Sequence, residues 1–70
     1  MDIKAEVAGA VFEILAREGE TVAKGAPLLI LESMKMEIVV QAPAPGVVAR
    51  VLVDINDIVE AGQVLVRLDP

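Results

Sequence analysis

The sequence predicts an all-β fold, a sandwich or flattened barrel of about eight short strands. Twelve Val and six Ile among the 70 residues favour sheet over helix, because both residue types are branched at Cβ. Short apolar segments alternate with turn residues along the chain, which is typical of short strands. A chain of this length allows one domain, residues 1–70, closed by hydrophobic packing because it has no Cys for disulfides.

An internal repeat supports this prediction, because an offset of 37 residues aligns residues 8–32 with residues 45–69. Chance matching of Val and Leu would not easily bring two pairs of glycines into register. A duplicated unit predicts a pseudo-twofold axis, with the connecting segment 33–44 at one end of the domain and both termini at the other. The seven identical pairs are Gly9/Gly46, Val11/Val48, Leu15/Leu52, Val22/Val59, Gly25/Gly62, Leu28/Leu65 and Leu31/Leu68.

The first strand is expected at Asp2–Val7, where polar and apolar residues alternate as in a half-buried strand. The next segment, residues 5–18, also suits a helix when it is considered alone. Its copy at Val47–Val53, however, has four Val in seven residues, which favours a strand. Because two copies of one unit share one structure, we expect strands at both Ala10–Ala16 and Val47–Val53.

The rest of each copy is expected to form a turn, a very short strand, a second turn and a longer strand. The first turn holds Gly19 in one copy and Asn56 in the other, and both residue types tolerate a left-handed backbone. Pro43 and Pro45 end the strand that follows the first copy. The strands expected in these segments are Thr21–Val22, Leu28–Ser33, Glu37–Ala42, Ile58–Val59 and Val64–Leu68.

The composition excludes several kinds of site. Without His or Cys, the usual ligands of zinc, haem and iron–sulfur clusters are missing, as are a His-based triad and a thiol nucleophile. A net charge of −5 and a single aromatic residue, Phe12, argue against a nucleic-acid partner. The longest uncharged segment, Ile38–Ala49, is too short to span a bilayer, and the N-terminus does not resemble a signal peptide. We therefore expect no metal site and no membrane partner. Because Phe12 is a large apolar residue, we expect it in the core.

The segment that connects the two copies predicts an unusual β-hairpin. Its centre, residues 32–37 with the sequence ESMKME, lies between two apolar runs but lacks the Asn-Gly or Asp-Gly pair that favours a two-residue turn. If Met34 and Lys35 form that turn, both need a positive φ, which costs about 1–2 kcal/mol per residue. Strain of this kind persists where function requires it. The position at the tip also argues against burial of Met34 and Met36.

These residues resemble the attachment motif of the biotinyl/lipoyl carrier domains, whose common pattern is Glu-Ala-Met-Lys-Met. Met34, Lys35 and Met36 match this motif, with Ser33 in place of the commoner Ala. The resemblance covers nearly the whole chain, including the paired glycines, and is strongest to the biotin carboxyl carriers of acyl-CoA carboxylases. It implies a flattened β-barrel of two four-stranded antiparallel sheets with the modified lysine on an exposed hairpin.

The resemblance also implies a function. Lys35 would be biotinylated by a biotin protein ligase, and the arm would carry carboxyl groups from a biotin carboxylase to a carboxyltransferase. Met34 and Met36 would be recognised by the ligase and pack beside the tether, with Ser33, Glu32 and Glu37 flanking them. A lysine side chain is almost fully protonated at pH 7, so activation has to come from the ligase. The chain is thus expected to be a non-catalytic, monomeric, cytoplasmic carrier.

Two other functions are compatible with the sequence. A lipoyl carrier of a 2-oxo acid dehydrogenase complex would share the fold and the lysine, and Ser33 is weak support for it. Its motif has Asp and Ala beside the lysine, however, whereas this chain has Met34 and Met36. The third possibility is a β-barrel adaptor in which Lys35 is not modified, and replacement of Lys35 would distinguish such an adaptor from a carrier.

Overall fold

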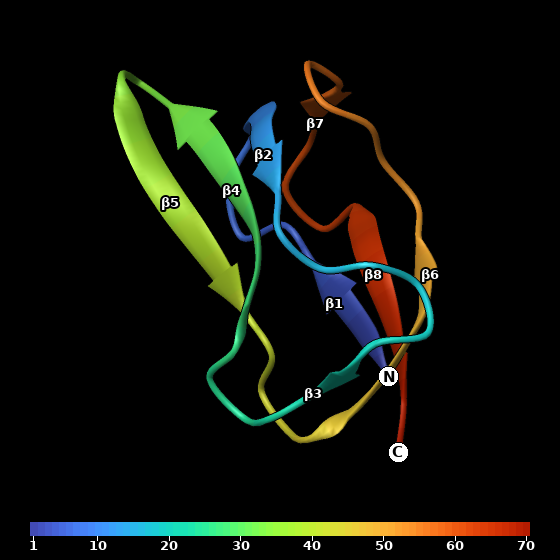
Figure 1. Cartoon of the computed structure of the whole chain (residues 1–70). Coiled ribbons are helices and arrows are strands. Elements are labelled where there is room, and N and C mark those ends of the chain that lie inside the picture. Colours follow the sequence, from blue (N-terminus) through green and yellow to red (C-terminus); the bar gives the residue numbers. More distant parts are fainter.

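The computed structural model describes all 70 residues and contains two four-stranded antiparallel sheets, as predicted (Figure 1). One sheet has the strand order β1-β8-β6-β3, and the other has the order β5-β4-β2-β7. The sheets pack face to face as a flattened barrel. The eight strands are β1 (Asp2–Lys4), β2 (Gly9–Ile14), β3 (Thr21–Val22), β4 (Pro27–Ser33), β5 (Met36–Gln41), β6 (Gly46–Val51), β7 (Ile58–Val59) and β8 (Val64–Asp69).

The two sheets are related by a pseudo-twofold axis, because exchanging β1 with β5, β2 with β6, β3 with β7 and β4 with β8 converts one strand order into the other. The match extends to irregularities. Phe12 in β2 and Ala49 in β6, which the repeat aligns, both lie at breaks in register against the neighbouring strand. The structure also extends the repeat beyond residues 8–32 and 45–69. The strand β5, within the connecting segment, is the counterpart of β1.

Three strand ends differ from the prediction by two or three residues, and the other differences are of one residue. The alternation in Asp2–Val7 continues past the end of β1, which stops at Lys4 because residues 6–7 form a bend. The strand β2 ends at Ile14 instead of Ala16, and β6 ends at Val51 instead of Val53. Beyond the end of β2, the backbone N–H groups of Leu15 and Ala16 both donate to one carbonyl, that of Leu28, so the ladder pattern is lost.

The core is a single cluster of 15 buried apolar residues with no buried polar side chain. Its largest fully buried members are Leu28, Leu29, Leu31 and Leu65, each contributing about 2–3 kcal/mol by burial. The prediction that Phe12 belongs to this core is wrong, since 48% of its surface is exposed. Phe12 follows the buried Val11, so the alternation of the strand points its side chain outward, and the break in register turns the next residue, Glu13, outward as well.

The glycine pair Gly9/Gly46 has a packing reason. A Cβ atom on Gly9 would lie 2.5 Å from the backbone carbonyl oxygen of Glu32 in β4. A Cβ atom on Gly46 would make the same clash with the carbonyl of Asp69 in β8. Close approach of two strands therefore requires glycine at the start of β2 and of β6.

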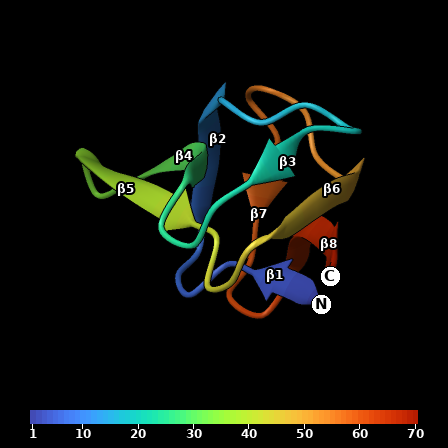
Figure 2. The same cartoon turned by 60° about the horizontal axis from the view of Figure 1, so that its bottom comes forward.

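The molecule is elongated, with extents of 32 × 18 × 18 Å. Figures 1 and 2 both place the β4–β5 hairpin at one end and the two termini at the other, as the repeat predicts. The termini are held together there, because the ammonium group of Met1 donates a hydrogen bond of 2.7 Å to the carbonyl of Leu68. None of the structure is helical, so no helix could cross a membrane.

Candidate functional site

The tip of the β4–β5 hairpin is a two-residue turn formed by Met34 and Lys35. Ser33 and Met36 are the last paired residues of the two strands. The turn residues have φ values of 52° for Met34 and 62° for Lys35, so the predicted positive φ is confirmed at both positions. Neither residue is glycine or asparagine, so a tip of this kind costs about 1–2 kcal/mol per residue relative to a relaxed turn. The lysine is thus held in a conformation that its own backbone disfavours.

The side chains at the tip project into solvent. Met34 is 89% exposed and Met36 is 60% exposed, so neither methionine fills the core. Lys35 is also exposed, and its ammonium group forms neither of the two ion pairs in the structure. Ser33 is half-buried at the base of the turn. The result is a primary amine at the extreme end of the molecule, free of any intramolecular partner.

A pair of like charges lies directly below the tip. Glu32 in β4 and Glu37 in β5 are cross-strand neighbours in the ladder, and both are exposed. Carboxylates in directly opposite positions repel each other and destabilise the hairpin by up to about 1 kcal/mol. The sequence identifies both residues as flanking the lysine, but only the register of the two strands shows that they lie opposite each other. The base of the tip therefore carries two unpaired negative charges.

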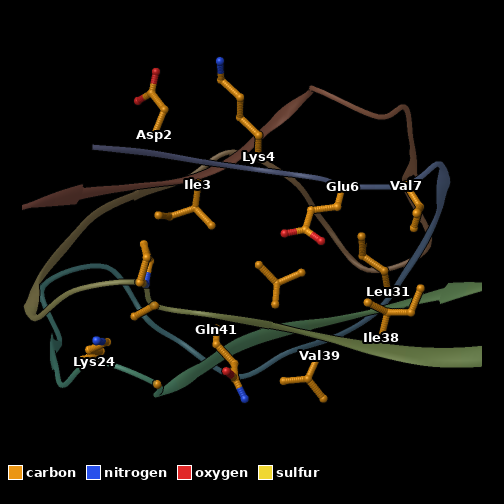
Figure 3. A pocket seen from close by; sticks show the side chains of 14 residues that line it. Asp2, Ile3, Lys4, Glu6, Val7, Lys24, Leu31, Ile38, Val39 and Gln41 are labelled. Atoms are coloured by element: carbon orange, nitrogen blue, oxygen red, sulfur yellow. The ribbon is translucent and has the colours of Figure 1, made fainter.

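The largest hollow of the molecule is a groove of about 490 Å³ between β1 and β5, the edge strands of the two sheets. Figure 3 shows Ile3 projecting into this space from the β1 side and Leu31 and Ile38 lining its far end, while Asp2 and Lys4 project away from it. Lys35 does not line the groove. The structure also contains no cluster of three or more potential metal ligands. The chemistry of the chain therefore centres on the amine at the hairpin tip, which can form an amide with a carboxyl group that another protein has activated.

Comparison with known proteins agrees with this geometry. A family described as "Biotin-requiring enzyme" matches residues 1–68. A biotinylated protein TB7.3 homologue of Mycobacterium leprae is 42% identical over 91% of this chain and 90% of its own length. The biotin carboxyl carrier protein of acetyl-CoA carboxylase from Solanum lycopersicum is 40% identical over 86% of each chain.

Two solved structures have the same fold. A domain of a single-chain, multi-domain long-chain acyl-CoA carboxylase superposes with a TM-score of 0.89 at 39% identity, covering 94% of this chain but 7% of that enzyme. The lipoyl domain of the 2-oxoglutarate dehydrogenase complex from Azotobacter vinelandii has a TM-score of 0.84 at 29% identity and is covered to 96%. The fold alone thus does not separate biotinyl from lipoyl domains. The resemblance noted in the sequence is confirmed, and the chain belongs to the biotin/lipoyl attachment family of biotin-requiring enzymes.

Proposed function

We propose that Lys35 is the biotin attachment site and that the chain acts as a biotin carboxyl carrier. The observation that carries this proposal is the position of the lysine: an exposed amine at the end of an elongated molecule, on a turn with two positive φ angles. Met34 and Met36 on either side of Lys35 favour biotin over lipoate as the attached group. The family and the biotinylated and carrier relatives support the same cofactor.

The chain itself supplies only the amine for the attachment reaction. The Nζ atom attacks the carbonyl carbon of a biotinyl-adenylate, the mixed anhydride supplied by a biotin protein ligase. The ammonium group first loses one proton to give the attacking amine, AMP then leaves, and a second proton is lost to solvent as the amide forms. The turn at the end of the hairpin keeps Nζ clear of the domain, and the core supports the hairpin without presenting any catalytic group. Loss of the ammonium charge changes the net charge of −5 to −6.

The attached group would accept a carboxyl group in one active site and deliver it in another. Both active sites belong to partner proteins or domains in this proposal: a biotin carboxylase and a carboxyltransferase, with an acyl-CoA or a related acceptor. The elongated shape supports this role, because the end that carries Lys35 can enter a partner while the termini stay outside. Tethering gives the carried group an effective concentration of about millimolar at the next site. The chain is thus a carrier and not itself an enzyme.

The decisive experiment is the intact mass of the chain after incubation with a biotin protein ligase, biotin and ATP, followed by peptide mapping. We expect one biotinyl group, located on Lys35 and absent from a Lys35→Arg variant. Lys24→Arg is the matched control, because it removes another exposed lysine and should still be biotinylated. An unmodified Lys35 would refute the proposal. Modification by a lipoyl ligase in place of the biotin ligase would assign the chain to the lipoyl carriers.

A further inference from the structure

The outer face of the β5-β4-β2-β7 sheet carries an exposed patch whose residues are fixed by the register. One row across the four strands is Ile58, Ala10, Glu32 and Glu37. The next row is Glu13, Ile30 and Val39, with Phe12 beside it at the break in register. Val11 and Leu31, which lie between these rows, are buried and therefore face the core. We name these eight outward residues, 10, 12, 13, 30, 32, 37, 39 and 58, the hairpin face.

Apolar side chains on the hairpin face are unusually exposed. Ile58 is 76% exposed, Phe12 is 48% exposed and Val39 is 47% exposed. Figure 3 shows Val39 on the opposite side of β5 from Ile38, which turns toward the groove. The only aromatic residue of the chain thus lies on the surface together with three β-branched residues, the third being the half-buried Ile30. Exposed apolar patches rimmed by charges mark interaction sites.

The pseudo-twofold axis provides an internal control for this face. Ile30 and Val39 are directly paired across β4 and β5. Their counterparts, Arg67 and Asp2, are paired in the same way across β8 and β1 and form an ion pair of 3.0 Å. The fold therefore accepts an ion pair at this position. Stability of the sheet does not explain why the hairpin face has apolar residues there. The same exchange relates Ile58 to Thr21 and Phe12 to Ala49.

The charges on the hairpin face identify the kind of occupant. Glu13, Glu32 and Glu37 take part in neither of the two ion pairs of the structure, so their negative charges are uncompensated. A second copy of the chain docking through the same face would bring both sets of carboxylates together, which costs free energy. A partner with an apolar centre and Lys or Arg side chains around it complements this face in both polarity and charge.

The hairpin face lies beside the tip, and this position indicates which partner of a carrier would bind it: the enzyme that modifies Lys35 or an enzyme that uses the attached biotin. An enzyme that acts on Nζ of Lys35 has to bring its reacting atom to about 3 Å from that nitrogen. Glu32 and Glu37 lie about two to three residues along the strands from Lys35, a distance of about 7–10 Å. The modifying enzyme therefore contacts the hairpin itself. An active site that uses the attached biotin can stand farther away, because the biotin chain extends beyond the end of the lysine side chain.

From these observations we infer that the hairpin face is the docking surface for the ligase that attaches biotin to Lys35. The ligase would place apolar side chains against Phe12, Ile30, Val39 and Ile58, with basic residues opposite the three carboxylates. This inference rests on the proposed function, and it adds the surface by which the folded domain is recognised. Recognition then depends on two strands outside the hairpin, β2 and β7, as well as on the residues beside the lysine.

The test exchanges the paired residues of the two faces. The variant Ile30→Arg with Val39→Asp places the ion pair of the other sheet on the hairpin face without changing the net charge. The matched control, Arg67→Ile with Asp2→Val, makes the reverse exchange on the opposite face, also without changing the net charge. We would measure kcat and KM for biotinylation by a ligase that modifies the wild-type chain, with the mass of the product as the readout. Circular dichroism and urea unfolding would verify that each variant is folded.

We expect the hairpin-face variant to lose about tenfold or more in kcat/KM, mainly through KM, while the control stays within about twofold of wild type. Wild-type kcat/KM should also fall with added salt, because the docking is partly electrostatic. If the exchanged pair prevents folding, the variant Phe12→Ala with Ile58→Thr tests the same face, using the residues of the other sheet. Equal kcat/KM for the folded hairpin-face variant and the control would overturn the inference. Absence of biotin from wild-type Lys35 would instead refute the proposed function.

Discussion

Because the turn at the hairpin tip is strained, we expect that replacing its two residues increases the free energy of unfolding of the chain. In the variant Met34→Asn with Lys35→Gly, both positive-φ positions receive the residues that favour this turn. The substitutions remove about 1–2 kcal/mol of strain at each position. Part of this gain is lost, because Asn keeps some strain at a positive φ and Gly adds about 0.5–1 kcal/mol of unfolded-state entropy. The net increase in the free energy of unfolding is about 1–2 kcal/mol. Little packing is lost, because Met34 is 89% exposed and Lys35 is also exposed.

The gain is large enough to measure in a domain of this size. An unfolding entropy of about 2.1 cal/mol/K per residue converts 1 kcal/mol into about 7 °C for the 70-residue chain, so we expect Tm to rise by about 7–14 °C. Thermal unfolding followed by circular dichroism gives Tm, and urea unfolding gives the free energy. The control is Asn56→Met, which puts a methionine at a φ of 76° and should cost about 1 kcal/mol. An unchanged or lower Tm for the double variant would refute the assignment of strain to the turn.

Three further predictions concern packing and charge, each measured as the change in the free energy of unfolding in urea. Gly9→Ala and Gly46→Ala should each cost about 2 kcal/mol or more, because the new methyl group clashes with the backbone of the neighbouring strand. A cost below about 0.5 kcal/mol would contradict this close approach of the strands. Leu65→Ala should cost about 2–5 kcal/mol and Phe12→Ala less than about 1 kcal/mol, and the reverse order would show that Phe12 is a core residue after all. Arg67→Met should cost at most about 1 kcal/mol because its ion pair with the N-terminal strand is exposed, and a larger loss would mean that this pair organises the sheet edge.

The repeat explains why so much of the fold could be predicted from the sequence. Residues 5–18 alone suit a helix, and only the Val-rich copy at residues 47–53 identifies residues 10–16 as a strand. The aligned turn residues Gly19 and Asn56 both have positive φ, as expected for two copies of one turn. Local propensity is ambiguous at these positions, and the requirement that two copies share one structure resolves it.

Features that depend on exact register could not be predicted in this way. The residue type of Phe12 favours the core, and only the register of β2 shows that Val11 takes the core position and leaves Phe12 on the outer face. The opposition of Glu32 and Glu37 also follows from register. At the site itself, the sequence predicts the exposed lysine and the positive φ at Met34 and Lys35. The apolar surface beside them becomes visible only when the two sheets are compared residue by residue.

The adjacent termini have a consequence for the architecture of larger assemblies. Under the pseudo-twofold axis, residues 70 and 1 correspond to Ser33 and Ile38, which lie on either side of the Met34–Lys35 turn at the other end. Joining the two ends by a short loop would complete a second hairpin, β8–β1, and cutting the first turn would give a circular permutant with the same strand order. A ring closed through a second Met-Lys-Met loop would be a two-headed carrier, with one attachment point at each end of a rod 32 Å long. The ordinary chain can be seen as this symmetric rod opened at one head, where it can be joined to other domains without obstructing the lysine at the far end.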